Sequence, residues 1–88
     1  MALLVLMQVG PVDRDRFRSA AEWMDAQDAP GRVSSRIYAA EGDPKTVLVA
    51  QEWESHDAFH SVSERLGPEF NARAGTEGLD WKTMTWVS

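Results

Sequence analysis

The chain has 88 residues, 43% of them hydrophobic, no cysteine and a formal net charge of −5. This length predicts one domain, residues 1–88, with a modest core, and the lack of cysteine excludes disulfides and thiolate metal sites. The nine basic residues are scattered among fourteen acidic ones, so neither nucleic acid nor a membrane surface is expected as a partner. Residues 2–9 lack the flanks of a signal peptide, and a cytoplasmic protein is expected.

The first part of the chain predicts a strand, a helix and a second strand. Residues 2–9 are apolar on both faces of an extended segment. A helix is expected from 14 to about 28, with Asp13 as its N-cap. Residues 32–40 alternate as a strand does, so odd and even positions lie on opposite faces. The buried stripe of the predicted helix is formed by Phe17, Ala20, Ala21 and Met24.

A hairpin and a second helix are predicted next. The turn at 41–44 leads into an apolar strand, 45–54, that pairs with the preceding one. Ser55 is expected to cap a helix over 56–66. The inner stripe of this helix is predicted to contain Phe59, Val62 and Leu66.

The remaining residues predict a break, a short helix and a last strand. Gly67-Pro68 is expected to interrupt the second helix, because proline cannot donate a helical hydrogen bond. Residues 69–74 then form a separate short helical piece, and 75–78 form a loop. The segment 79–87 reads as a strand rich in tryptophan and threonine, in which Trp81 and Trp86 have opposite parity.

The predicted order, strand-helix-strand-strand-helix-strand, indicates an α+β fold with a ferredoxin-like antiparallel sheet and both helices on one face. In this topology the first and third strands are central, and these are the two continuously apolar strands. Their second face would remain bare in a monomer, which soluble proteins rarely tolerate. A two-fold homodimer with the open faces packed together is therefore expected.

A succession of short segments runs through the chain: Pro30-Gly31, a strand with Tyr38, Asp43-Pro44, Glu52-Trp53-Glu54-Ser55, Ala58-Phe59 and Pro68-Glu69-Phe70. This succession resembles the antibiotic biosynthesis monooxygenase domain family over nearly the whole chain. The resemblance implies a dimeric α+β barrel with a pocket between the helices and the sheet of each subunit. Some members oxidise aromatic polyketide intermediates with dioxygen and neither metal nor flavin. Others degrade haem, act as isomerases or cyclases, or have no assigned reaction.

The resemblance also suggests catalytic residues. Trp53 matches the pocket tryptophan of the polyketide-oxidising members, where its ring forms a wall and its N–H can bind a ligand oxygen. Those members place an asparagine four residues earlier, where this chain has Val49. Gln51 shares the Trp53 face by strand parity and could replace that asparagine, while Gln8 is a further polar residue on an apolar strand. Arg73 stands near the position of the arginine that follows the second helix.

Further candidates come from the residues themselves. His60 is a candidate general base because imidazole titrates near neutral pH, and its spacing from His56 alone does not make a metal site. Tyr38, Phe59 and Trp23 are candidates for substrate binding. Each of these residues also has a purely structural alternative, such as a solvated helix flank or a sheet edge.

The sequence therefore predicts a cofactor-independent monooxygenase, or a related tailoring enzyme of secondary metabolism, that acts on an aromatic, polyketide-like small molecule. No metal or organic cofactor is implied. Haem degradation is not expected, because the asparagine, tryptophan and histidine of the haem-degrading members are missing. Two alternatives stay open: a non-catalytic dimeric barrel that binds a small hydrophobic ligand, and a cyclase or isomerase with the same pocket. The expected partners are the substrate and a second copy of the chain.

Overall fold

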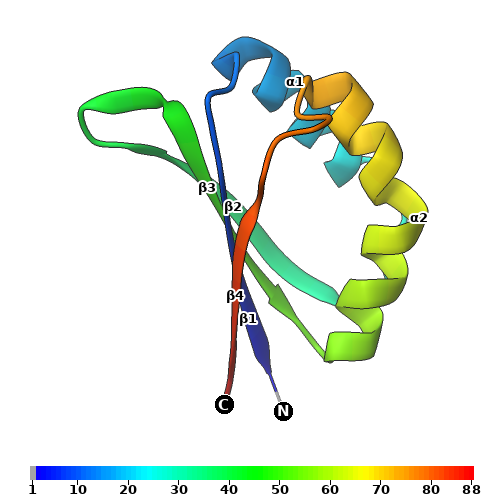
Figure 1. Ribbon diagram of the computed structural model, residues 1–88. Helices are drawn as coiled ribbons and strands as arrows, with labels where there is room; N and C mark the ends of the chain where they lie inside the picture. Colours follow the sequence, from blue (N-terminus) through cyan, green and yellow to red (C-terminus); the bar gives the residue numbers. More distant parts are fainter. Residues whose placement is uncertain (1) are drawn as a thin grey trace.

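The structure is a computed structural model that describes residues 2–88, and it forms a four-stranded antiparallel sheet covered on one face by two helices (Figure 1). The sheet order is β2-β3-β1-β4, so the predicted ferredoxin-like fold is confirmed and the two most apolar strands are central. The elements are β1 (Leu3–Val9), α1 (Arg14–Asp25), β2 (Arg32–Ala40), β3 (Asp43–Trp53), α2 (His56–Ala74) and β4 (Lys82–Val87).

The two central strands turn alternate residues toward the helices. In β1 the buried residues are Leu3, Val5 and Val9, and in β3 they are Val47, Val49, Gln51 and Trp53. The register pairs Leu3 with Trp53 and Val5 with Gln51, so these buried side chains form one continuous layer. Because neighbouring residues of a strand point to opposite faces, the intervening residues lie on the open face of the sheet.

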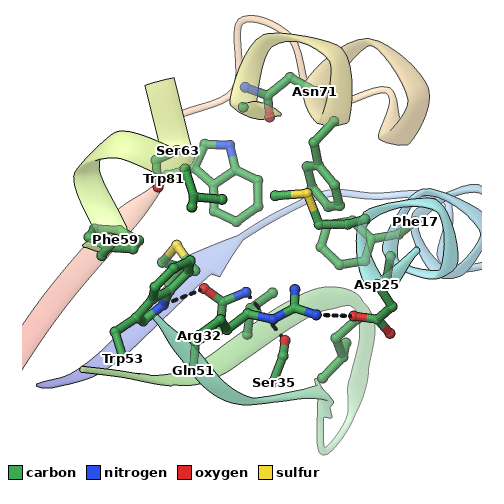
Figure 2. A pocket seen from close by; sticks show the side chains of 18 residues that line it. Phe17, Asp25, Arg32, Ser35, Gln51, Trp53, Phe59, Ser63, Asn71 and Trp81 are labelled. Atoms are coloured by element: carbon green, nitrogen blue, oxygen red, sulfur yellow. Dashed lines mark hydrogen bonds and ion pairs between the residues drawn. The ribbon is translucent and has the colours of Figure 1, made fainter. Parts of the chain in front are cut away.

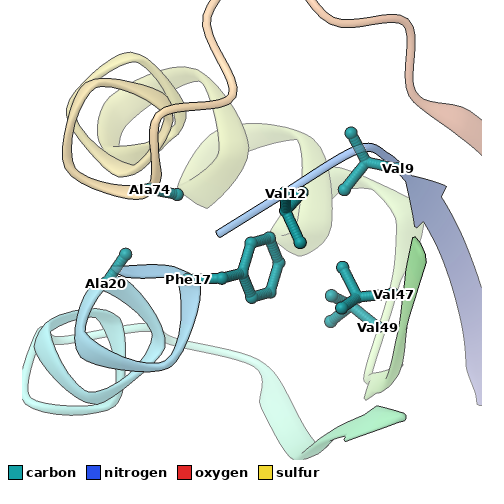
Figure 3. Packing of buried hydrophobic residues seen from close by; sticks show 7 residues of the cluster. All are labelled: Val9, Val12, Phe17, Ala20, Val47, Val49 and Ala74. Carbon is teal, nitrogen blue, oxygen red and sulfur yellow. The ribbon is translucent and has the colours of Figure 1, made fainter. Parts of the chain in front are cut away.

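The core beneath the helices consists of two buried clusters. The first, shown in Figure 3, contains Val9, Val12, Phe17, Ala20, Val47, Val49 and Ala74. The second contains Leu3, Val5, Trp53, Val62 and Leu66. Met7 is partly buried and packs against both clusters. Phe17 also meets Phe70 edge to face, with ring centroids 5.4 Å apart, which joins α1 to the C-terminal half of α2.

Helix α2 begins where the sequence predicts, but it does not break. The Ser55 hydroxyl accepts a hydrogen bond from the backbone N–H of Ala58 at 3.1 Å, so the predicted cap is confirmed. The predicted interruption at Gly67-Pro68 is wrong, because the helix continues to Ala74. Phe70 and Ala74 extend the inner stripe onto the first cluster. Packing of this stripe outweighs the single backbone hydrogen bond that Pro68 cannot donate, and the exposed Pro68 ring lies on the outer side.

Three element boundaries also differ from the prediction. Strand β3 begins at Asp43 rather than 45, because Asp43 already pairs with Ala40, and the predicted turn at 41–44 shortens accordingly. Helix α1 ends at Asp25 rather than near residue 28, because its last turn tightens: the Gln27 N–H bonds the Met24 carbonyl, three residues back. Strand β4 begins at Lys82 rather than 79. The residue before it, Trp81, packs against the first cluster instead of pairing in the sheet.

The open face of the sheet carries a band of apolar side chains. Trp86 lies opposite Leu4, and Met84 opposite Leu6, in the pairing of β4 with β1. Trp86 and Met84 are each 57% exposed. Trp81 and Trp86 therefore lie on opposite sides of the sheet, as their parity predicts. The Ser88 N–H donates to the Ala2 carbonyl at 3.1 Å, so the first and last described residues are neighbours (Figure 1).

No helix within residues 2–88 is both long enough and apolar enough to span a membrane.

Replacing Ser55 with alanine is expected to lower the free energy of unfolding by about 1 kcal/mol, because one N–H of the first turn of α2 loses its acceptor. Urea unfolding followed by circular dichroism measures the change. Ser61→Ala is the matched control, since Ser61 is an exposed residue within the same helix. Equal unfolding midpoints for the two variants would show that the cap contributes nothing.

Candidate functional site

A cavity of about 280 Å³ lies between the helices and the sheet (Figure 2). Its walls are mainly apolar, with the aromatic rings of Phe17, Trp53, Phe59, Phe70 and Trp81. Six polar residues also line it: Asp25, Arg32, Ser35, Gln51, Ser63 and Asn71. An apolar hollow with a few polar groups, near the lower end of the roughly 300–1,000 Å³ range, is typical of small-molecule sites.

The cavity separates the two halves of the core. Phe17 and Val49, on one side, belong to the first cluster, while Trp53 and Val62, on the other, belong to the second. Trp53 and Phe59 meet edge to face with their centroids 5.6 Å apart. The helices thus cover the sheet without filling the space above its middle.

A buried hydrogen-bond chain runs along the sheet side of the cavity. The Trp53 indole Nε1–H donates to Gln51 Oε1 at 3.0 Å, and Gln51 Nε2 donates to Ser35 Oγ at 3.3 Å. Strand geometry explains the chain: Gln51 and Trp53 are two apart in β3, and Ser35 is the cross-strand partner of Gln51. The indole N–H is therefore already bonded. The second N–H of the Gln51 amide and the O–H of Ser35, which only accepts in this chain, are donors that it can offer to a ligand.

An ion pair lies beside this chain. Arg32 Nη2 is 3.0 Å from Asp25 Oδ1, and the side chains of Arg32 and Asp25 are 15% and 63% exposed. Figure 2 shows the Arg32 guanidinium between Gln51 and Asp25, beneath the aromatic rings. A largely buried guanidinium held at one corner by a carboxylate keeps its other N–H groups in a fixed orientation.

A β-bulge at the start of β2 brings Arg32 to the cavity. Arg32 is the partner of Trp53 and Ser34 is the partner of Glu52, so Val33 is an extra residue in the strand. Uninterrupted alternation would set Val33 opposite Trp53 and turn Arg32 to the open face. Instead Val33 is 62% exposed. Sequence reasoning missed Arg32 for this reason, since no residue pattern at 32–34 marks the bulge.

In the α2 wall, Phe59 is followed at a spacing of four by Ser63, Gly67 and Asn71. Asn71 Oδ1 accepts a hydrogen bond from Thr76 Oγ1 at 2.7 Å, so its Nδ2 group is left for other partners. Gly67 has no atom within 4 Å of the position that a Cβ would occupy. A helical period continued beyond Gly67-Pro68 would have placed Gly67 and Asn71 on the same face of the helix as Ser63.

Of the residues predicted from the sequence, Trp53, Gln51 and Phe59 line the cavity together. Arg73 does not: its guanidinium lies 4.6 Å over the Trp23 ring, and its Nε is 3.1 Å from Glu69 Oε2. Trp23 is thus covered by Arg73 and is not part of the lining either. This group stabilises the contact between the two helices from outside.

The remaining three predicted residues also lie away from the cavity. His60 is on the outer side of α2, 64% exposed, with Nε2 3.0 Å from Glu64 Oε1. Gln8 and Tyr38 are exposed on the open face of the sheet. Within residues 2–88 there is no cluster of three or more histidine, aspartate or glutamate side chains that could hold a metal ion.

No family model and no curated protein matches the sequence. Solved structures match over the whole chain. A conserved protein from Methanosarcina mazei Go1 has a TM-score of 0.78 at 10% identity, over 100% of this chain and 93% of that one. A candidate antibiotic biosynthesis monooxygenase from Chloroflexus aurantiacus has a TM-score of 0.76 at 16% identity, over 100% of this chain and 93% of that one. SnoaB, a cofactor-independent oxygenase from Streptomyces nogalater, has a TM-score of 0.71 at 18% identity, over 99% of this chain and 91% of that one.

These similarities establish the fold. Several of the matched proteins are described as candidate antibiotic biosynthesis monooxygenases, and the same arrangement of four strands and two helices recurs at identities of 10–18%. The similarity that the sequence predicted is therefore present at the level of three-dimensional structure. The chemistry of this chain has to be argued from its own cavity, because one fold serves many reactions.

Replacing Gly67 with alanine is expected to raise the free energy of unfolding by about 0.5–1 kcal/mol, because glycine is costly inside a helix and the new methyl group meets no atom.

Gly67→Leu is expected to fill the cavity and abolish quenching of tryptophan fluorescence by 9,10-anthraquinone. Ala72→Leu, on the exposed side of the same helix, is the matched control and should bind normally. Unchanged binding by Gly67→Leu would mean that the ligand does not enter this cavity.

Proposed function

We propose that this protein is a cofactor-independent oxygenase, or a related tailoring enzyme, that acts on a flat aromatic, polyketide-like molecule. The observation that carries the proposal is the cavity itself: aromatic walls, with a hydrogen-bond chain from Trp53 through Gln51 to Ser35 on the sheet side. The fold shared with SnoaB, a cofactor-independent oxygenase, supports the same class.

The chemistry needs little from the protein. An anthrone-like substrate has an acidic CH₂ group opposite a ketone, and loss of one proton gives an electron-rich enolate. This anion transfers an electron to dioxygen, and the two radicals combine into a peroxide that loses water. In balance, the CH₂ group and O₂ become a second ketone and H₂O. The cavity would exclude bulk water, and the free N–H of Gln51 would stabilise the enolate oxygen.

The candidate proton acceptor differs from the one predicted by sequence. His60 is directed away from the cavity, and Asp25 is the one carboxylate among the described lining residues. The lack of a histidine in this lining favours the second candidate function, a barrel that binds a hydrophobic ligand without catalysis. A cyclase or isomerase would use the same cavity and the same enolate chemistry without dioxygen.

A second copy of the chain is the proposed occupant of the open sheet face. This face carries Leu4, Leu6, Met84 and Trp86 in adjacent rows, an apolar band of the kind that soluble proteins cover. The same face carries Arg36 on the edge strand β2 and Glu52 on the central strand β3, opposite Leu4, so a two-fold contact can pair opposite charges. The helices lie on the other side of the sheet, so this contact leaves the cavity accessible.

Light scattering at micromolar concentration is expected to give twice the mass of one chain. Leu4→Asp should give the mass of one chain, because a carboxylate would be buried without a partner at the contact. Ser61→Asp adds the same charge on the helical side and should leave the mass unchanged. A wild-type protein with the mass of a single chain would contradict the proposed dimer.

Purified, metal-free protein supplied with anthrone is expected to consume dioxygen above the uncatalysed background, as measured with an oxygen electrode. Gln51→Leu should lower kcat by about 100-fold, the effect typical of losing one donor to a developing oxyanion. Ser61→Ala should keep the wild-type rate, and thermal melting must show that each variant is folded. Uptake no faster than background would exclude the oxygenase for this substrate class and favour ligand binding or an oxygen-independent reaction.

A further inference from the structure

We infer that Arg32 is an anion-binding residue of the cavity, so that the protein selects flat aromatic ligands that carry one carboxylate or another acidic oxygen. The inference rests on the proposed function only in taking this cavity as the ligand site. It specifies the substrate class more closely, because an apolar cavity alone would accept any flat hydrophobic molecule.

Arg32 has more N–H donors than its one side-chain partner can bind. Its side chain is only 15% exposed, and its one side-chain partner is Asp25, bonded through Nη2. Within residues 2–88 no fully buried side-chain nitrogen or oxygen lacks a partner. The Nε and Nη1 groups of Arg32 must therefore border open space, and Arg32 lines the cavity. These N–H groups are available to a ligand and largely removed from bulk water.

The charge of Arg32 also favours an anionic ligand. A cation in an apolar hollow has lost most of its hydration, so it gains much from an anion that replaces the lost water. The Asp25 carboxylate offsets this charge incompletely, since it contacts one nitrogen and is itself 63% exposed to solvent. The whole chain has a net charge of −5, which repels anions in general. A preference for an anionic ligand would thus have to come from this local group.

Arg32 lies where it could reach a group attached to an aromatic ring in the cavity. The bulge at Val33 sets Arg32 opposite Trp53, and Figure 2 shows its guanidinium beside Gln51 at the edge of the aromatic lining. A flat ring between Trp53, Phe59 and Phe17 could extend an acidic group toward the free nitrogens of Arg32. A guanidinium fork binds the two oxygens of a carboxylate in one plane, which orients the ring as well as anchoring it.

The test compares two ligands of the same shape, anthraquinone-2-carboxylic acid and anthraquinone-2-carboxamide, by quenching of tryptophan fluorescence at pH 7. The wild-type protein is expected to bind the acid at least about tenfold more tightly than the amide, the size typical of one charge-assisted contact. Equal affinities, or no binding of either compound, would overturn the inference without any variant.

Variants then assign the preference to a residue. Arg32→Met should bind the two compounds equally, and Arg32→Lys should keep part of the preference. Arg18→Met is the control, because Arg18 is an exposed arginine of α1 that does not line the cavity, and it should behave as wild type. A preference that survives in Arg32→Met would overturn the inference. Oxygen uptake with anthrone, which carries no carboxylate, tests the proposed function separately.

Discussion

Covering the sheet from one side only is the constraint that shapes this molecule. Two helices, of 12 and 19 residues, contact each other above four strands, and their buried side chains gather in two clusters rather than one. Two consequences follow. The space between the clusters remains as a cavity, and the other face of the sheet keeps an exposed apolar band. The site and the proposed dimer contact therefore have the same origin.

The polar groups of the cavity hold one another in place. Trp53, Gln51 and Ser35 are joined in a single hydrogen-bond chain, and Asp25 fixes one corner of the Arg32 guanidinium. Each member of this network has its principal hydrogen bond within the protein. A ligand of the proposed kind would therefore bind with little reorganisation of these groups.

The sequence predicted the residues whose direction follows from a simple period. Strand parity places Gln51 and Trp53 on one face, and helical spacing places Phe59 on the inner stripe; all three line the cavity. Arg73 and His60 were suggested by distance along the chain and by residue type, and the structure places both on the outer surface.

Residues that depend on an irregularity could not be predicted in this way. Arg32 reaches the cavity through a bulge that shifts the strand period by one residue. Gly67 and Asn71 belong to a helix that continues through a proline, because the packing of its inner stripe outweighs a local propensity. In each case a long-range contact overrides the rule that applies to the isolated segment.

The bulge at Val33 also affects how this protein should be aligned with others of its fold. The extra residue is accommodated locally, and Ser34–Ala39 keep a regular register with β3. Two chains can therefore differ in length by one residue here and still have the same cavity. An ungapped alignment would then match Val33, rather than Arg32, with the residue that faces the indole. The residue that corresponds to Arg32 in a related protein therefore has to be found by superposing the two structures. At sequence identities of 10–18%, a sequence alignment alone will not identify it.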